Sequence, residues 1–488
     1  MAEALLIDAS DDVATLLEDA AAGERAAGVT LVEPVARGHK LARHAIAAGA
    51  PVRKFGYPIG RATRAIAAGE HVHQHNVATA LGGAGDYAYR PSAPAAVRPA
   101  LAATFEGYVR GDGRVGTRTE IWVLPTVGCV ARTAERIATR AAAALGGLVD
   151  GVHAFSHPHG CSQLGQDLAG TRTILASLAC HPNAAGVLIV GLGCEENQVA
   201  ALVSEIPEWR RPAIRVLAAQ ASDDEVSEGV AKIMELAPIA QVERTVVGLD
   251  RLVLGVKCGG SDGLSGLTAN PLVGRVSDRV VEAGGRVLLT EIPEVFGAEQ
   301  MLMDRAVDAQ VFEAVVDVVN GFKRYFLDHG EPVSENPSPG NVAGGITTLE
   351  EKSLGAVQKA GRAPLSDVIG YGERVRSDGL TLLEAPGNDA VSCTALVAAG
   401  ATAILFTTGR GTPLGFPVPT IKIATNHALA ARKPRWIDFD AGSVLDDGFE
   451  ASEAALIDRV VAIASGEETA AERNEEREIA IWKRGVTL

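Results

Sequence analysis

The sequence predicts a multidomain α/β protein, in which a small β-rich N-terminal domain precedes two α/β segments with mainly parallel sheets. From residue 106 onward, short apolar runs alternate with longer stretches of helical periodicity, an order typical of βαβ units. The 54 glycines fall at predicted strand-to-helix joints without forming a repeat. Before residue 79, short alternating runs punctuated by glycine favour a β-rich unit instead.

We expect four regions along the 488 residues, since a chain of this length usually holds about two to four domains. They are a β-rich domain over 1–90, a linker over 91–105, an α/β domain over 106–245 and a C-terminal α/β domain over 246–488. The linker is assigned from its three prolines and from the glycines just before it.

The elements that we expect follow from hydrophobic periodicity. Strands are predicted over 120–127, 151–155, 186–190 and 213–217, then over 252–256, 286–290, 380–384 and 403–407. Helices are predicted over 131–145, 164–179 and 197–206, and an amphipathic helix over 451–466. The charged run 467–477 is interpreted as a solvated continuation of that last helix.

Charge and composition exclude several classes of protein. The net charge of −15 and the lack of a Lys/Arg cluster disfavour nucleic acid and anionic membranes as partners. The longest apolar stretch, Ala184 to Leu192, is too short to span a bilayer. The N-terminus lacks a basic signal-peptide segment, and six widely spaced cysteines do not form a disulfide framework. We therefore expect a cytoplasmic protein with a small-molecule partner, and a homo-oligomer is compatible with the sequence.

The loop 257–266 carries the densest set of reactive side chains. It follows a predicted buried strand, so it should lie at the carboxyl edge of a sheet, where open α/β sheets bind ligands. Lys257, Ser261 and Asp262 supply an amine, a hydroxyl and a carboxylate, and Asn270 follows shortly after. The alternative is a tight glycine turn without a ligand.

Three histidines with a spacing of two, His71, His73 and His75, would share one face of a strand. Neighbours on that face lie about 7 Å apart, so two of them could bind one metal only where the strand ends or bends. The alternative is an exposed polar strand face.

Cysteines accompany glycine turns at several predicted strand ends. Cys161, in a loop with His153, His157 and His159, stands at a predicted helix N-terminus, which would favour an anion and lower the thiol pKa. The alternative is a capped helix with solvent-facing histidines. Cys129, Cys161, Cys194 and Cys258 could gather round a metal or an iron–sulfur cluster, although no C-x-x-C spacing supports one. Partly buried thiols are the alternative.

Later loops suit a polyhydroxylated anion. Arg410, in a Thr-Gly-Arg-Gly-Thr stretch after a predicted strand, could hold a carboxylate with two hydrogen bonds. Lys422 and Asn426 add an amine and an amide farther on. By contrast, the stretch 191–198 lacks the G-x-G-x-x-G spacing of a dinucleotide site.

At these motifs the sequence resembles the altronate and galactarate dehydratase family, along essentially the whole chain. Residues 12–78, with Arg-Gly-His-Lys at 37–40 and Gly-Glu-His-Val-His at 69–73, resemble the small SAF domain that opens this family. The other matching stretches are 111–118, 124–129, 159–164, 181–183, 191–195, 257–270, 291–294, 336–345, 408–411 and 485–488.

The resemblance implies a ferrous-iron-dependent hydro-lyase that converts D-altronate to 2-dehydro-3-deoxy-D-gluconate in hexuronate catabolism. Mn²⁺ or another divalent metal is the alternative cofactor. From the chemistry of the step we expect metal ligands at His71 and His73. Catalytic roles are expected for His39, His73, Lys257 and Asp262, and substrate contacts for Lys54, Cys161, Ser261, Asn270, Arg410 and Lys422.

The sequence leaves four other functions open. Two belong to the same superfamily: a galactarate or other sugar-acid dehydratase, and a sulfolactate sulfo-lyase. A nicotinamide-dependent dehydrogenase is disfavoured by the missing dinucleotide fingerprint. A non-enzymatic sugar-binding protein would not need so many titratable groups beside glycine turns.

Overall fold

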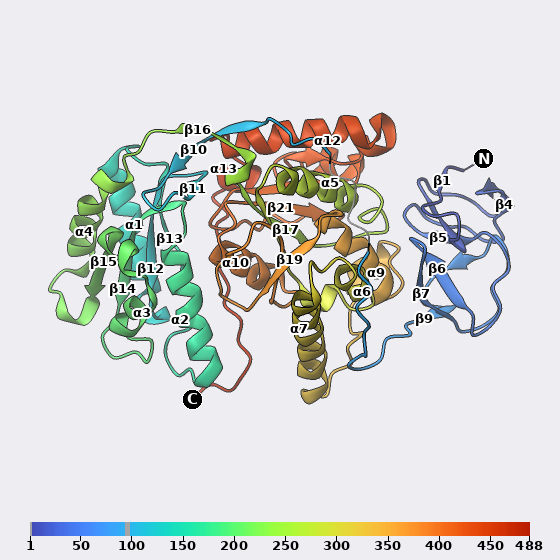
Figure 1. Ribbon diagram of the computed structural model, residues 1–488, viewed down its shortest axis with the longest axis horizontal. Helices are drawn as coiled ribbons and strands as arrows, with labels where there is room; N and C mark the ends of the chain where they lie inside the picture. The colour runs from blue at the N-terminus through green and yellow to red at the C-terminus, as the bar shows by residue number, and fades with distance from the viewer. Residues whose placement is uncertain (1, 93–97) are drawn as a thin grey trace.

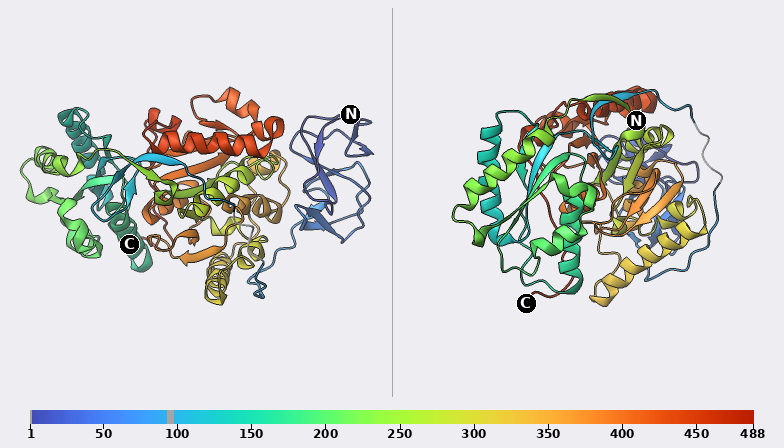
Figure 2. Two further views of the ribbon diagram at one scale, coloured as in Figure 1. Left: turned by 45° about the horizontal axis from the view of Figure 1, so that its top comes forward. Right: turned by 60° about the vertical axis from the view of Figure 1, so that its left-hand side comes forward.

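The computed structural model describes residues 2–92 and 98–488. Three bodies lie in a row: a β-rich N-terminal unit (2–80) at one end, the C-terminal domain (249–488) in the centre and the middle domain (104–248) at the other end (Figures 1 and 2). The predicted fold class, a β-rich unit followed by α/β segments with parallel sheets, is confirmed.

The N-terminal unit is built from short antiparallel strands. One sheet has the order β1-β2-β5-β8, a second has the order β6-β7-β9, and β3 pairs with β4. Its strands are β1 (Ala4–Leu5), β2 (Val13–Leu16), β3 (Arg25–Ala26), β4 (Val29–Thr30), β5 (Lys40–Ala42), β6 (Pro51–Lys54), β7 (Tyr57–Ala62), β8 (His71–Val72) and β9 (Val77–Ala78). β8 ends before His73, and the chain then turns, with Asn76 Oδ1 accepting a hydrogen bond from the His73 amide. The three histidines therefore do not lie along one straight strand.

The middle domain has a parallel sheet of order β13-β12-β14-β15, with helices on both faces. Helices α1 and α4 share one hydrophobic core with Ile121, Val123 and Leu188, whereas α2 and α3 cover Trp122 and Leu124 on the other face. The elements are β12 (Glu120–Pro125), β13 (Gly151–Ala154), β14 (Ala184–Gly191), β15 (Ile214–Ala218), α1 (Ala131–Leu145), α2 (Gly165–Ala179), α3 (Val199–Glu205) and α4 (Glu225–Ala240). The predicted strands and helices of this region are confirmed, while α4 was not predicted.

A small antiparallel sheet, β11-β10-β16, joins the middle and C-terminal domains. Its strands are β10 (Thr104–Val109), β11 (Val115–Gly116) and β16 (Thr245–Gly248). The chain before β10 is anchored to the C-terminal domain: Arg98 pairs with Glu282 and Glu453, and the Tyr89 hydroxyl donates to the Ala306 carbonyl. The described residues on either side of 93–97 therefore contact the C-terminal domain.

The C-terminal domain is a parallel sheet of order β19-β20-β18-β17-β21-β22-β23, with β17 at its centre. Alternate residues serve opposite faces: Val287 packs toward α5 and α12, and Leu288 packs toward α10. The strands are β17 (Val253–Cys258), β18 (Arg286–Leu289), β19 (Leu365–Ile369), β20 (Gly379–Leu383), β21 (Ala403–Thr408), β22 (Thr420–Ala424) and β23 (Phe439–Asp440).

The helices of this domain are α5 (Ala269–Glu282), α6 (Glu299–Met303), α7 (Ala309–Asp328), α8 (Pro339–Ala343), α9 (Leu349–Ala356), α10 (Asp389–Ala399), α11 (His427–Arg432), α12 (Ser443–Ala464) and α13 (Ala470–Arg473). The prediction that 467–477 continues the preceding helix as a solvated face is wrong. Glu472, on the short helix α13, is buried against Arg118 of the middle domain, with a 2.9 Å ion pair. Within 2–92 and 98–488, no helix is both long and apolar enough to cross a membrane.

The N-terminal unit is docked on the C-terminal domain by backbone-to-backbone contact. Gly38 faces the loop after β17, where a Cβ added to Gly263 would overlap the Gly38 carbonyl oxygen. A Cβ at Gly345 would meet the same oxygen. Glycine is needed at these positions because only a residue without a side chain allows the two backbones to approach so closely.

We expect Gly263→Ala to displace the N-terminal unit and to lower the free energy of unfolding by about 1–3 kcal/mol, the usual cost of overpacking. Urea unfolding and the rate of proteolysis of segment 81–103 would measure the two effects. The matched control is Gly321→Ala, within α7, where an added Cβ meets nothing within 4 Å. That change should be neutral or stabilising by about 0.5–1 kcal/mol. Equal behaviour of the two variants would contradict the docking role.

Candidate functional site

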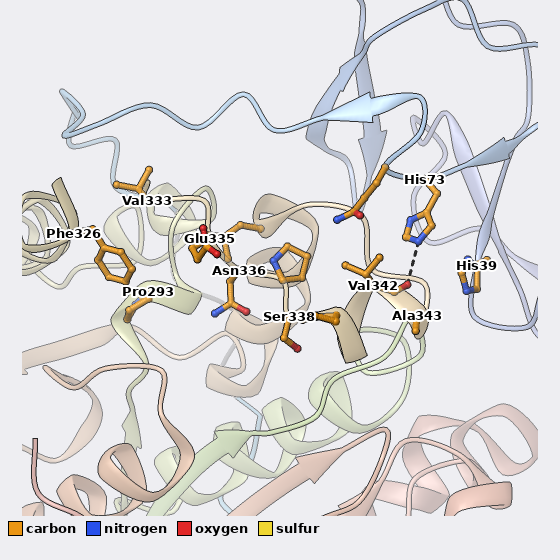
Figure 3. Close-up of a pocket in the computed structure, with 14 residues that line it drawn as sticks. His39, His73, Pro293, Phe326, Val333, Glu335, Asn336, Ser338, Val342 and Ala343 are labelled. Carbon is orange, nitrogen blue, oxygen red and sulfur yellow. Dashed lines mark hydrogen bonds between the residues drawn. The ribbon is translucent and has the colours of Figure 1, made fainter. Parts of the chain in front are cut away.

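A cavity of about 840 Å³ lies between the N-terminal unit and the C-terminal domain. Figure 3 shows His39 and His73 reaching it from the N-terminal unit, opposite a wall that includes Pro293, Asn336 and Val342. We call it the interdomain cavity. Each domain supplies polar side chains to it, so the site is complete only when the two are docked.

His39, His71 and His73 form a compact cluster at this cavity. The ring centroid of His39 lies 5.1 Å from the centroid of His71 and 5.1 Å from that of His73. The centroids of His71 and His73 are 5.4 Å apart. β5 and β8, which lie side by side in the sheet, carry Lys40 and His71, so the pairing of these strands brings His39 to the histidines at 71 and 73. The Nδ1 atom of His39 lies 3.0 Å from the Nε2 atom of His71.

All three imidazoles are held in the neutral form. Burial lowers the pKa of His39, helped by the nearby charge of Lys40. Burial and the neighbouring histidines lower the pKa of His71 to about 3, and burial and Lys40 lower that of His73 to about 4. A neutral imidazole can accept a proton or bind a metal ion, so near pH 7 the cluster is ready for either task.

The protonation of His73 follows from its two partners. Its Nε2 lies 3.1 Å from the Val342 carbonyl oxygen, which can only accept, so Nε2 carries the proton (Figure 3). The Nδ1 atom, 3.1 Å from the Thr347 hydroxyl, is then the acceptor. Val342 belongs to α8 and Thr347 to the loop that follows it, so these two neighbouring segments fix the ring orientation.

The geometry of the cluster fits a divalent metal in part. Two nitrogen ligands with bonds of about 2.0–2.1 Å to one ion can lie at the 3.0 Å separation seen between His39 and His71. His73 is adjacent but is turned toward Val342 and Thr347. Farther out, among the described residues, Glu33, Glu70 and His75 bring one ligand atom each within 4.8 Å of one another. Glu70 is already paired with Arg64 there.

A buried charge triad lies next to the histidines. Glu351, on α9, makes ion pairs with Lys54 at 2.8 Å and with Lys40 at 2.9 Å. Burial alone would raise the pKa of Glu351, but the two ammonium groups lower it to about 2. Burial lowers the pKa of Lys40 to about 8. Lys54, predicted to contact substrate, is thus engaged in joining the two domains.

A second charged network lies at the carboxyl edge of the central sheet. Lys257, at the end of β17, is completely buried and pairs with Glu291 after β18 and with Asp389 after β20. Burial opposes its charge, but these carboxylates outweigh that cost and raise its pKa well above the usual value. Lys359 donates to the other Glu291 oxygen at 3.1 Å. The two carboxylates therefore favour the charged form of Lys257, which is suited to stabilise negative charge.

The network extends to the interdomain cavity through one further lysine. Lys352 pairs with Glu294 at 2.8 Å and donates to the Asn336 side chain at 3.1 Å. Burial lowers the pKa of Lys352, but Glu294 outweighs that and raises it. Asn336 lines the cavity. The charged ammonium group of Lys352 is therefore separated from the cavity by the Asn336 side chain alone.

The loop after β17 is held by its own polar side chains. Asp262 accepts hydrogen bonds from the Ser265 and Thr425 hydroxyls, each at 3.0 Å, and burial raises its pKa. The Ser261 hydroxyl lies 2.6 Å from the Cys258 thiol. Asn270 accepts from Thr407 at 2.6 Å and donates to the Gly355 carbonyl at 3.0 Å.

The structure brings most of the predicted site residues together. His39 and His73 line the interdomain cavity, and His71 packs beside them. Lys257, Ser261, Asp262 and Asn270 lie at the carboxyl edge of the central sheet, next to the docked N-terminal unit. Arg410 is exposed and donates at 3.3 Å to the Gly340 carbonyl of α8, the helix that lines the cavity.

Two predicted residues lie apart from this site. Lys422 points away from the cavity: its ammonium donates to the carbonyls of Thr412 and Leu414 and lies 5.0 Å from the centre of the Phe406 ring. Burial lowers its pKa to about 8. Cys161 belongs to the middle domain and lines a separate cavity there. Its expected lowered thiol pKa is wrong, because a hydrogen bond with the Glu196 carboxylate raises the pKa of Cys161.

Five charged residues of these networks were not predicted as functional residues from the sequence: Glu291, Glu294, Lys352, Lys359 and Asp389. Glu291 and Asp389 each follow a predicted strand of the same sheet, so the rule that selected Lys257 could have selected them. The two lysines carry no such signal, because they follow the sheet at a distance on α9 and the short 3₁₀ turn Val357–Ala360.

Three family models match the chain in order. They are the altronate/galactarate dehydratase SAF domain over 2–80, the D-galactarate dehydratase/altronate hydrolase second domain over 107–241 and the D-galactarate/altronate dehydratase C-terminal domain over 249–487. Over 490 residues the chain is 49% identical to altronate dehydratase of Escherichia coli (strain K12), with 99% of each chain covered. The chain belongs to the altronate/galactarate dehydratase family.

Two further family members show the range of similarity. Altronate dehydratase of Bacillus subtilis (strain 168) is 45% identical over 491 residues, with 99% of each chain covered. Galactarate dehydratase (L-threo-forming) of Escherichia coli (strain K12) is 33% identical over 482 residues, covering 94% of this chain and 92% of the relative. The family resemblance and the N-terminal SAF domain expected from the motifs are confirmed.

We expect Glu351→Gln to destabilise the docked state by about 3–5 kcal/mol, because it leaves two buried ammonium groups without their carboxylate. Urea unfolding and proteolysis of segment 81–103 would again report the change. Glu331→Gln, at an exposed position with no ion pair to any residue that the structure describes, is the matched control and should change stability by less than about 0.5 kcal/mol. A Glu351→Gln variant as stable as this control would exclude a structural role for the triad.

Proposed function

We propose that this protein dehydrates D-altronate to 2-dehydro-3-deoxy-D-gluconate with the help of a ferrous ion, as a step of hexuronate catabolism. The choice of substrate is supported by full-length identities of 49% and 45% to two altronate dehydratases, against 33% to a galactarate dehydratase. The chemistry is supported by one observation above all: neutral histidines and protonated lysines meet around one cavity.

The reaction needs both kinds of group. A base must remove the proton at C2, next to the carboxylate, and an acid must protonate the hydroxyl that leaves from C3. Loss of water gives an enol, which tautomerises to the 2-keto acid. The hard part is the negative charge that builds up on the carboxylate as the C2 proton leaves, so fixed positive charge near that group lowers the barrier.

We assign proton removal to the histidine cluster. His39 and His73 are neutral and line the cavity, and His73 presents an unprotonated Nδ1 once Thr347 releases it. Lys352, held by Glu294 and Asn336, supplies positive charge behind the cavity wall. Lys257 is assigned to the same electrostatic role deeper in the site, and Arg410 to the substrate carboxylate at the rim.

His39 and His71 would hold the metal through the two nitrogens that lie 3.0 Å apart, which leaves Nδ1 of His73 available as the base. A divalent ion bound there would neutralise charge on the substrate carboxylate and hydroxyl groups. Mn²⁺ is the alternative to Fe²⁺. The six cysteines are free thiols, which supports the expectation of a reducing, cytoplasmic environment.

We expect purified, thiol-reduced protein loaded with ferrous iron to form a 2-keto-3-deoxy acid from D-altronate at least tenfold faster than from galactarate. A chelator should abolish turnover, and added Fe²⁺ should restore it. Preference for galactarate would keep the mechanism and change the substrate. Sulfolactate is the third substrate to assay, and no product from any of the three would refute the proposal.

We expect His73→Ala to lower kcat by roughly 10²–10⁴-fold, the usual contribution of a positioned acid–base group. Circular dichroism should show an unchanged fold. The matched control is His44→Ala, since His44 lies on the same unit but is exposed and pairs with Asp12. Its kcat should stay within about twofold of the unmodified protein. Near-normal turnover by His73→Ala would remove His73 from the mechanism.

A further inference from the structure

The middle domain carries a second concentration of reactive side chains, remote from the interdomain cavity. Cys129, Cys161 and Cys194 follow β12, β13 and β14, respectively. β12 lies between β13 and β14 in the sheet, and all three strands are parallel. The three thiols therefore leave the sheet at the same carboxyl edge, on neighbouring strands.

We propose that Cys129, Cys161 and Cys194 are thiolate ligands of a metal centre at this edge, either an iron–sulfur cluster or a single thiophilic ion. Cys258, which the sequence pattern grouped with them, does not join: it ends β17 of the other sheet and is buried against Ser261. The inference goes beyond the proposed dehydration and does not rest on it.

The loops that carry the three thiols are hydrogen-bonded to one another. The Gly128 amide donates to the His159 carbonyl at 2.9 Å, which joins the first loop to the second. The Asn197 amide donates to the Gly160 carbonyl at 3.1 Å, and the Ser162 amide donates to the Glu196 carboxylate at 2.9 Å, which join the second loop to the third.

Glycine lets these loops pack against each other. A Cβ at Gly160, where φ is +100°, would overlap the carbonyl oxygen of Thr126. The Asn197 side chain donates to that same carbonyl at 3.1 Å. The loop backbones are thus held against one another before any ligand arrives, which limits the movement that a metal site would require.

Exposure sets these thiols apart from the rest of the chain. Of the six cysteines, Cys180, Cys258 and Cys393 are buried, and Cys129, Cys161 and Cys194 are exposed. Free cysteine is among the most commonly buried residue types, so three exposed thiols at one sheet edge need an explanation other than packing. A cavity of about 600 Å³ opens there, lined by Cys129, Cys161, Ser156 and His157.

The polar groups around the thiols favour a metal over an anion or a hard cation. Both nitrogens of His157 are used, one at 2.8 Å from the Pro125 carbonyl and the other accepting from the His159 amide, so His157 braces the loop. Glu195 accepts from Thr126 and from the Gly193 amide. The three thiols have only weak partners: the Gln220 side chain donates to Cys194 Sγ at 3.6 Å, and Cys161 lies against Glu196. As thiolates they would select soft metals and iron–sulfur clusters.

Three thiolates would leave one coordination position open. Glu196, which lies beside Cys161 through the Ser162 amide, is the residue placed to supply an oxygen ligand, with water as the alternative. Within the part of the chain that the structure describes, the three sulfur atoms do not all lie within 4.8 Å of one another, so a single ion would require the loops to move together. A cluster separates its thiolate ligands more widely than one ion does, so it needs less movement of the three loops and is the favoured centre.

The test is the metal and sulfide content of the full-length protein purified without oxygen. We expect about one metal centre per chain. Iron with an equal amount of acid-labile sulfide and visible absorption would identify a cluster, and zinc or iron without sulfide would identify a single ion. The variants Cys129→Ser, Cys161→Ser and Cys194→Ser should each lose most of this metal, with unchanged circular dichroism.

Two controls separate this centre from the histidine cluster. Cys180→Ala, at a buried thiol of the same domain, should keep the metal. A variant with His71→Ala should also keep the thiol-bound metal even if it loses iron at the interdomain cavity. Protein without bound metal, a disulfide between two of the three thiols, or serine variants that retain the metal would each overturn the proposal.

Discussion

The contact between the N-terminal unit and the C-terminal domain determines whether the interdomain cavity exists. Two features make this contact: glycine backbones that touch at Gly38 and Gly263, and the buried pairing of Lys40 and Lys54 with Glu351. Burying three charges is costly unless they are paired, so the triad is stable only in the docked arrangement. The same contact places His39 and His73 opposite the Asn336 wall. Geometry and electrostatics therefore specify one relative position of the two domains.

Around that contact, the titratable groups of the two domains differ in charge. Histidines on the N-terminal unit are kept neutral by burial and by Lys40, whereas lysines on the C-terminal domain are kept charged by Glu291, Glu294 and Asp389. Two environments thus push neighbouring titratable groups toward opposite protonation states. Acid and base can then act on the same small molecule near neutral pH. The middle domain also places reactive side chains at the carboxyl edge of its parallel sheet, but there they are thiols and not lysines and carboxylates.

Much of this organisation could be predicted from the sequence because it is local. The period of the apolar residues predicted α1 over the residues it occupies and β17 to within two residues. The rule that ligands bind after strands selected Lys257, Asp262 and Asn270, which lie at the sheet edge. The spacing of the histidines drew attention to His71 and His73, and family motifs added His39.

The sequence by itself determined the elements, the domain order and the side chains available at each strand end, because these depend on residues near one another in the chain. Only the tertiary structure decided which of those side chains meet. Glu351 is about 300 residues from Lys54 in the sequence, and no local pattern indicates that their charges are shared. Lys422 and Arg410 both belong to polar stretches near strands. Yet Lys422 donates to two backbone carbonyls away from the cavity, whereas Arg410 contacts α8 at the edge of the cavity. Strand order and domain docking fix such partners, since long-range burial and charge pairing select one packing out of many that share the same local pattern.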